Sequence, residues 1–461
     1  MNTTDARTAG VPPRAAGYPS LGTAGVVIGV LFAVTLMAQL DRQLPALLVR
    51  PLRAEFGLSD TAFSLLQGYA FALSFTLAGL PLGRWVDRSS RKLLILAGLL
   101  FWSAATALFA FGRSYEELLL ARVGVGIGEA VLAPAAYSLI ADLVPSYQRG
   151  RALAIYGVSL AIGSGASLLL GGWLLAAIPA EGLHVAGFGD LAAWRVAFLA
   201  AAAPGLPLAL LLMLAVREPA RQHDTAVVAP ADASSLADFF AHLRRHPGCF
   251  ARLLAFPSVL SYLGYAALGW APALFERSHG IAPSRSGVVL GVLVALAGAA
   301  GMLCGGAWSD RWLAGARPAA RLRVALLGMA VASAPALLWP VLPSAALGFG
   351  LIAVMVFGIS LAQSAVPTSI QAVFPNRLRG QAFACYLLMS GLLGIGLGPT
   401  AVALLADRVL PREAGLGMAI AMAAAPAVLL GLWMLASGLR PYARCDAELN
   451  PTAPARPGSA G

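Results

Sequence analysis

Two charged residues, Asp41 and Arg42, lie inside an apolar run that extends from Leu21 to Val49. A charge at the centre of a membrane-spanning helix costs roughly 2.5–3.5 kcal/mol on the insertion scale. Because adjacent helical residues point about 100° apart, these two side chains cannot pair well with each other. Each therefore needs another partner, or water.

A second apolar run carries suitable partners, Arg122 and Glu129. Their spacing of seven residues places them on one helical face, about 10 Å apart along the axis. Counting at about 1.5 Å per residue puts Asp41 and Arg122 at a similar depth, roughly 10–14 Å below the outer surface, with Glu129 deeper. The sequence therefore predicts that Asp41 and Arg122 meet, with Glu129 below them.

Asp41, Arg122 and Glu129 together predict a proton-coupling site. An arginine that shifts its pairing among two acids and an anionic substrate group changes the proton affinity of the acid that it leaves. A static ion network that holds the two helices together is the alternative. Arg42, left without an acidic partner, suits a phosphate or carboxylate headgroup, or else it extends to the outer interface.

The whole chain has the composition of a membrane protein. Of its 461 residues 59% are hydrophobic and 11% are charged, and the mean hydropathy is +0.78. Apolar segments of about 20 or more residues recur along it, each long enough to cross a bilayer. We predict an all-α protein with twelve transmembrane helices, over residues 22–49, 60–84, 92–112, 115–142, 149–178, 194–216, 250–276, 285–312, 320–341, 344–373, 379–407 and 413–438.

The domain organisation follows from the polar stretches between these spans. In the longest of them, Leu236, Phe239, Phe240 and Leu243 recur at helical spacing beside basic residues. This pattern predicts an amphipathic helix on the membrane surface. The predicted domains are a flexible cytoplasmic tail over 1–20, a six-helix bundle over 21–216, a cytoplasmic linker over 217–249, a second six-helix bundle over 250–439 and a cytoplasmic tail over 440–461.

Basic residues predict the orientation. With a cytoplasmic N-terminus, 22 Lys and Arg residues fall in segments on the inner side and 8 on the outer side. Cytoplasmic loops are enriched in positive charge, so we predict a multi-pass protein of the cell inner membrane with both termini in the cytoplasm. The net charge of +11 does not indicate nucleic-acid binding, because the basic residues lie in short loops.

Other chemistry finds little support in the sequence. The four cysteines are scattered without metal-ligand spacing, which predicts no metal site. The single lysine, Lys92, is not part of a phosphate-binding loop, and no nucleophile motif is present, so we expect no enzyme. We expect no cofactor beyond a proton as the coupling ion.

The two halves of the chain repeat. "GRWVDRSSRK" from Gly83 follows the second span, and "GAWSDRWLAGAR" from Gly306 follows the eighth. "PSYQRGRALAIYG" from Pro145 precedes the fifth span, and "PNRLRGQAFACYL" from Pro375 precedes the eleventh. Two pairs of loops in the same order indicate a duplicated six-helix unit.

The repeated Gly–x3–Asp–Arg–x2–Arg loop resembles the signature of the major facilitator superfamily. Within it, "LDRQLPALL", "FGLSDTAFSLLQGYAFALSF" and "ARVGVGIGEA" resemble the spinster-like lipid transporters. The resemblance implies two pseudo-symmetric six-helix bundles that work by alternating access, with helices 1, 4, 7 and 10 around a central cavity. Charges within spans are expected to face such a cavity rather than lipid.

The loop residues predict gating contacts at the cytoplasmic side. Asp87 can accept hydrogen bonds from a helix N-terminus of the other half, and Arg91 and Arg149 can bridge helix ends. The second copy offers Asp310 and Arg379. The alternative is that all these charges only set the topology at a wet surface.

The second half has no charge in the middle of a span, and offers polar and aromatic residues instead. The predicted substrate contacts, besides Arg42, are Tyr262, Tyr265, Gln363, Thr368 and Ser369. One charged wall and one mildly polar wall suit an amphipathic anionic lipid, such as a lysophospholipid or a sphingoid phosphate. The alternatives are a proton-coupled carrier of small organic anions or drugs and, less favoured, a non-transporting sensor. We expect a monomer among membrane lipids.

Overall fold

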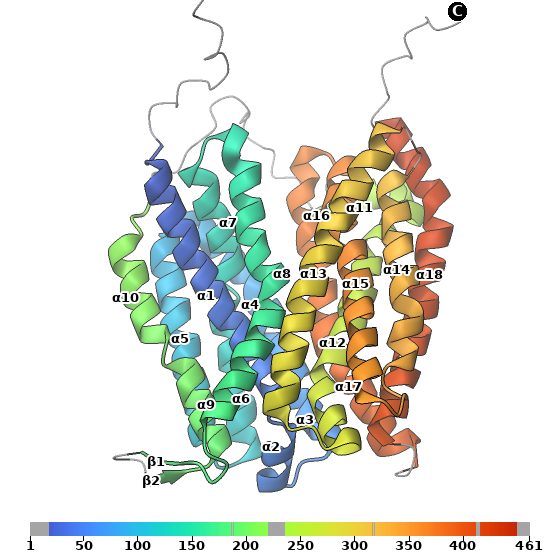
Figure 1. Ribbon diagram of the computed structural model, residues 1–461. Helices are drawn as coiled ribbons and strands as arrows, with labels where there is room; N and C mark the ends of the chain where they lie inside the picture. The colour runs from blue at the N-terminus through green and yellow to red at the C-terminus, as the bar shows by residue number, and fades with distance from the viewer. Residues whose placement is uncertain are drawn as a thin grey trace, which may run out of the picture.

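The computed structural model describes residues 18–185, 187, 189–219, 236–315, 317, 319–411 and 415–449. Two helical bundles stand side by side, and the described chain begins and ends at the same end of the molecule (Figure 1). We call the opposite end, which carries α2 (Val49–Phe56) and α3 (Asp60–Ser64), the distal end. The charge bias predicts that the distal end faces outward.

The N-terminal bundle contains six crossings, several of which are divided into shorter helices. In addition to α2 and α3 it consists of α1 (Leu21–Leu47), the π-helix η1 (Leu65–Tyr69), α4 (Ala70–Arg88), α5 (Arg91–Phe111), α6 (Tyr115–Glu129), α7 (Leu132–Leu143), α8 (Ser146–Ala177), α9 (Ala193–Ala202) and α10 (Gly205–Ala215). A short antiparallel hairpin, β1 (Leu183–Val185) and β2 (Gly189–Leu191), lies at the distal end.

The C-terminal bundle begins after a linker helix, α11 (Leu236–Arg245). It consists of α12 (Pro247–His279), α13 (Pro283–Ala314), α14 (Ala320–Leu338), α15 (Ala345–Val373), α16 (Asn376–Met389), η2 (Ser390–Gly396), α17 (Leu397–Leu404), η3 (Leu405–Val409) and α18 (Gly415–Leu449).

The twelve predicted crossings correspond to these elements in order. Among the described residues, eleven stretches of helix are long and apolar enough to cross a membrane. The fifth crossing, α8, contributes a shorter apolar stretch over Ile162–Ala177. The predicted all-α fold of two six-helix bundles is therefore confirmed, with the small hairpin as an addition that the sequence analysis did not predict.

Prolines explain two of the places where a crossing is divided. A proline lacks the N–H for an α-helical bond and clashes with the carbonyl four residues earlier. Pro134 lies four residues after Ala130, where α6 gives way to α7, and Pro207 lies four residues after Ala203, where α9 gives way to α10. Local chemistry thus divides single membrane crossings without ending them.

Glycines bring the two halves into close contact near the distal end. A Cβ atom at Gly172 of α8 would lie 2.6 Å from the carbonyl oxygen of Ser284 in α13, and one at Gly68 of η1 would lie 2.5 Å from the carbonyl oxygen of Ile395 in η2. Toward the other end, the ribbons of the two bundles diverge (Figure 1). The structure is therefore closed at the distal end.

The structure adds detail to the predicted linker and C-terminal tail. On α11, Phe239 and His242 are buried against the protein, where Phe239 stacks on Phe374 and His242 contacts Phe250. Part of its apolar face thus packs on the C-terminal bundle. Phe240 is 53% exposed, and the placement of this helix on the membrane surface stays a prediction. In addition, α18 continues to Leu449, so the predicted tail from 440 is helical over its first part.

Candidate transport site

Four charged side chains from α1 and α6 form the centre of the candidate site. Asp41 is 0% exposed, Glu129 1% and Arg122 2%, whereas the side chain of Arg42 is 18% exposed. The sequence therefore correctly placed Asp41, Arg122 and Glu129 in one buried neighbourhood. Arg42 is therefore the least buried member of this cluster.

Arg42 pairs with Glu129, which the sequence analysis did not predict. Its Nε donates to Glu129 Oε2 over 2.7 Å, and its guanidinium lies 4.9 Å from the ring centroids of Phe71 and Phe75. The expectation that Arg42 lacks an acidic partner is therefore wrong. Counting residues gave the depth of each group but not the rotation of α1, which decides whether Asp41 or Arg42 faces Glu129.

Arg122 contacts the backbone of α1 rather than the carboxylate of Asp41. Its Nη1 donates to the main-chain oxygen of Asp41 over 3.1 Å, and its Nη2 to that of Gln67 over 3.3 Å. Gln67 belongs to η1, and π-helical turns are frequent at functional sites. Asp41 and Arg122 do meet at one depth, but not as the predicted ion pair.

The carboxylate of Asp41 is left without a hydrogen bond. Neither of its side-chain oxygens has a partner among the described residues, and the hydroxyl of Thr106 lies nearby outside hydrogen-bond geometry. Arg122 Nε and Glu129 Oε1 are likewise buried without a partner. Unsatisfied buried polar groups are costly, so their concentration here is unusual for a purely structural network.

A cavity of about 240 Å³ lies beside this cluster, between the two bundles. Its polar lining comes from both halves and includes Gln43 of α1, Ser164 of α8, and Tyr265 and Gln363 of the C-terminal bundle. Tyr265 also lines the small space that contains Arg42 and Arg122, so it joins the cavity to the charges. Pockets that enclose drug-sized ligands are typically larger, about 300–1,000 Å³, so a bulky solute would need further opening.

Of the predicted polar contacts in the second half, the structure brings Tyr265 and Gln363 to the cavity and not the others. Tyr262 donates its hydroxyl proton to the Ala423 carbonyl of α18 over 3.3 Å. Thr368 bonds within its own helix, and Ser369 is 1% exposed. Thr368 and Ser369 are not in the cavity lining because they lie about 140° and 120° around α15 from Gln363.

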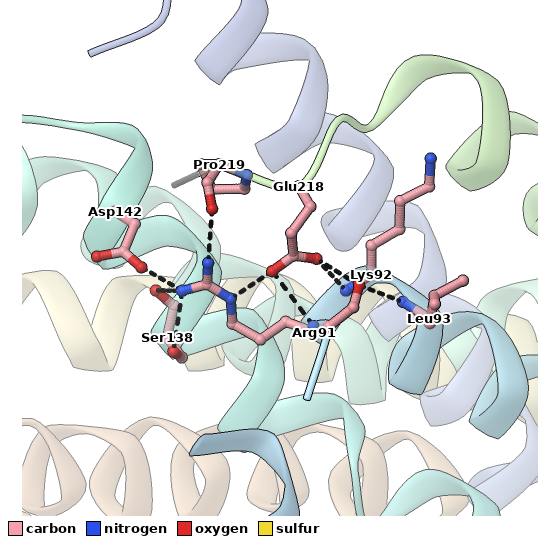
Figure 2. Close-up of polar contacts among 8 residues, drawn as sticks. Arg91, Lys92, Leu93, Ser138, Asp142, Glu218 and Pro219 are labelled. Atoms are coloured by element: carbon pink, nitrogen blue, oxygen red, sulfur yellow. Dashed lines mark hydrogen bonds and ion pairs between the residues drawn. The ribbon is translucent and has the colours of Figure 1, made fainter. Parts of the chain in front are cut away.

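Arg91 joins three segments of the N-terminal bundle (Figure 2). Its Nε donates to Glu218 Oε1 over 2.7 Å, its Nη1 forms an ion pair with Asp142, and its Nη2 donates to the Pro219 carbonyl over 3.0 Å. Arg91 thus bridges the ends of α5 and α7 and the segment after α10, as expected. It does so within one bundle, so its gating role stays a prediction.

Glu218 also caps α5. It accepts hydrogen bonds from the backbone N–H of Lys92 and the hydroxyl of Ser90, both over 2.8 Å. Partial burial by itself raises the pKa of Glu218, but the hydrogen bonds from Lys92, Arg91 and Ser90 outweigh it and hold this pKa below its usual value. The sequence analysis missed Glu218 because its partners are more than 100 residues away in the chain.

The other predicted gating residues receive less support from the geometry. Arg379 donates to the Phe374 and Gln371 carbonyls over 3.0 and 2.7 Å, and so satisfies the end of α15 within its own bundle. Asp310 is exposed. The side chains of Asp87 and Arg149 lie outside the part that the structure describes, so their roles stay predictions.

The halves are joined at the distal end by charges that the sequence analysis had counted only as outer-loop residues. Arg277 of α12 donates to both oxygens of Asp60 over 2.7 and 2.8 Å, and Arg53 pairs with the same carboxylate over 2.9 Å. Arg50 pairs with Glu276 over 3.2 Å. Asp60 and Arg277 are 217 residues apart, and no local motif predicts such a pair.

Comparison with known proteins defines the class. The Major Facilitator Superfamily description matches residues 31–399, which is most of the chain. The chain therefore belongs to the major facilitator superfamily, and it is a membrane transport protein.

The relatives within the superfamily are more specific. The chain is 30% identical to "Protein spinster homolog 1" of Homo sapiens, covering 85% of this chain and 74% of the relative. It is also 30% identical to an "MFS-type efflux pump" of Mycolicibacterium smegmatis, covering 83% and 85%. The resemblance to spinster proteins is confirmed.

Solved structures agree with this assignment. A bacterial homologue of the human lysosomal transporter Spinster, in an inward-facing and unoccupied conformation, superposes with a TM-score of 0.75 at 25% identity, covering 95% of this chain and 100% of that one. A D-xylose–proton symporter superposes with a TM-score of 0.65 at 17% identity, covering 89% and 97%, and shows the shared fold alone.

Proposed function

We propose that this protein is a proton-coupled secondary transporter that moves an amphipathic anionic lipid across the cell inner membrane by alternating access. The lipid class is a lysophospholipid or a sphingoid phosphate. It works as a monomer, with both termini in the cytoplasm and a proton as its coupling ion. The family and the spinster relatives support transport, and the buried charges support the coupling and the anionic substrate.

The unpartnered carboxylate of Asp41 is the observation that carries the proton coupling. An ionised carboxylate that is fully buried without a hydrogen bond is costly in a low-dielectric site. Arg122 is within reach through its contact with the Asp41 backbone, and a small rotation would bring the two charges together. Asp41 can therefore hold a proton in one arrangement of the bundles, and release it to form an ion pair with Arg122 in another.

The pair of Arg42 and Glu129 connects the substrate to the proton. An anionic headgroup at Arg42 competes with Glu129 for the same guanidinium. Glu129, once released in a buried position, is stabilised by taking up a proton. Tyr265 and Gln363 provide the opposite wall, and Phe71 and Phe75 provide apolar contact beside the charge.

A carrier of small organic anions or drugs is the second candidate. The relative described as an efflux pump favours it, as does the cavity of about 240 Å³, which fits a small solute better than a lipid. The span that contains α8 has no Gly-Pro pair, and this counts against a drug–proton antiporter. A non-transporting sensor is the least favoured, because the buried acids are present.

Reconstitution into vesicles with an imposed pH gradient tests the proposal. Lysophospholipids, sphingoid phosphates, organic anions and drugs are compared as solutes, and Asp41→Asn and Glu129→Gln as variants. We expect lipid transport driven by the gradient in the parent protein, and transport insensitive to it in both variants. Asp190→Asn, in the exposed hairpin, is the matched control.

The outcomes separate the parts of this proposal. If both variants respond to the gradient as the parent does, proton coupling at these acids is wrong. If organic anions or drugs are transported and the lipids are not, the second candidate replaces the first.

A further inference from the structure

A second polar cavity, apart from the central one, lies at the distal end between the two bundles. Its volume is about 210 Å³, several times the roughly 30 Å³ that one water occupies in the liquid. It is lined by Val49, Arg50 and Arg53 of α2 and by Ala273, Glu276 and Arg277 of α12. Both halves therefore contribute arginines to one small space.

The charges around this cavity are unbalanced. Three guanidinium groups face it, and the carboxylates that pair with them are Glu276 and Asp60. Asp60 pairs with two arginines at once, Arg53 and Arg277. The side chain of Arg50 is 79% exposed, and its pair with Glu276, at 3.2 Å, is the longest of these contacts. A net positive charge is left over at an accessible site.

The geometry of the arginines suits an oxyanion. A guanidinium presents five N–H donors in a planar fork that matches carboxylate and phosphate groups. Asp60, which accepts from Arg277 through both of its oxygens and also from Arg53, shows that these side chains can surround one anionic group. Arg50 brings further donors to the open side of the cavity.

We propose that this distal cavity binds a phosphate or carboxylate group, carried by a soluble anion or by a lipid headgroup. The bound group is held by Arg50 and Arg53 from one half and by Arg277 from the other. The inference goes beyond the proposed transport function and holds whichever solute the central cavity carries.

Binding there has a consequence for the contact between the halves. The anion competes with Asp60 for Arg277 and with Glu276 for Arg50, and these are the two ion pairs that cross between the halves around this cavity. A bound anion therefore weakens these direct ion pairs. The contact between the halves then depends on whether the anion is bound. The site is both a binding site and a point at which an anion acts on distal closure.

Calorimetric titration of the purified full-length protein in lipid nanodiscs tests the site, at fixed ionic strength because exposed charges are screened by salt. Inorganic phosphate and a lysophosphatidate are the two probes. Arg50→Gln is compared with Arg113→Gln, an exposed arginine at the outer end of α6 with no part in the cavity. We expect Arg50→Gln to weaken binding about fivefold, the effect of one exposed charge contact, and Arg113→Gln to leave it unchanged.

Variants of the competing carboxylates have the opposite expected effect. Asp60→Asn and Glu276→Gln each remove a competitor, so both should tighten binding by a similar factor. Glu276→Gln keeps this arm testable if the buried Asp60 is needed for folding.

Each probe reports on one source of the anion. Arg50-dependent binding of inorganic phosphate supports a soluble anion, and Arg50-dependent binding of lysophosphatidate alone supports a lipid headgroup. The proposal is overturned if neither probe binds, if Arg50→Gln and Arg113→Gln bind alike, or if removing the carboxylates weakens binding.

Discussion

The central cluster and the distal cluster use charge in different ways. In the centre, Asp41 and Arg42 of α1 face Arg122 and Glu129 of α6, so all four belong to one bundle and some of their atoms lack partners. At the distal end, Asp60 and its arginines come from both bundles, and the carboxylate is paired through both of its oxygens.

This difference separates two tasks. Charges that are satisfied across the boundary between the bundles stabilise one arrangement of the bundles. Charges that are buried and partly unsatisfied within one bundle can change partner or protonation at low cost, which suits coupling to a solute. Three predictions test this division, from the largest expected effect to the smallest.

The first prediction concerns the buried central pair. Arg42→Gln leaves Glu129 buried without its partner, and breaking such a pair costs about 3–5 kcal/mol in fully buried cases. We expect a large fall in thermal stability at neutral pH, somewhat reduced by the partial exposure of Arg42. The measurement is the unfolding temperature in detergent.

The double variant Arg42→Gln/Glu129→Gln is the control for this prediction. It removes both charges and should recover most of the lost stability. If the stability loss of the double variant equals the sum of the losses in the two single variants, the two residues are not energetically coupled. The central cluster would then differ less from the distal cluster than we infer.

The second prediction concerns the distal closure. Arg277→Gln removes the bidentate contact with Asp60 that crosses between the bundles, while Arg53→Gln removes a contact with the same carboxylate inside one bundle. We expect Arg277→Gln to shift the population toward distal opening by about fivefold, and Arg53→Gln to shift it much less. Spin labels on the distal ends of α2 and α12 report the separation.

An equal shift in both variants would mean that the number of ion pairs formed by Asp60 controls the closure, whether or not they cross between the bundles. The two clusters would then differ in how many charges surround each carboxylate, and not in which bundle supplies them.

The third prediction concerns Glu218, whose contacts lie within one bundle. Its pKa is lower in the folded protein than in the unfolded chain, so its stabilising effect is present above the unfolded pKa of about 4.3 and is lost as the pH falls through the folded pKa. We expect Glu218→Gln to lower the unfolding temperature slightly near pH 7, and this difference to disappear in strong acid.

The measurement is the unfolding temperature of both proteins from neutral pH to below pH 4. Glu218→Gln should not change the distal separation that spin labels report, because its contacts with Arg91 and Lys92 do not cross between the bundles. A change in that separation would show that a contact inside one bundle also controls closure.

Local patterns predicted a large part of this protein. Apolar runs gave the twelve crossings, the repeated loops gave the two bundles, and the charges within spans gave the buried cluster of Asp41, Arg122 and Glu129. The linker helix α11 shows the limit of such reasoning. Its amphipathic pattern was correct, but the pattern does not say whether the apolar face meets lipid or protein, and Phe239 and His242 pack on protein.

By itself the sequence determined which segments are long and apolar enough to cross a membrane and where each charge lies along its segment, because hydrophobic length and the rise per residue are local properties. Only the tertiary structure decided the partners. Arg42 rather than Arg122 pairs with Glu129 because of the rotation of α1, and Asp60 meets Arg277 because two bundles close on each other. Rotation and packing between segments far apart in the chain depend on every surrounding contact, so no short stretch of sequence contains them.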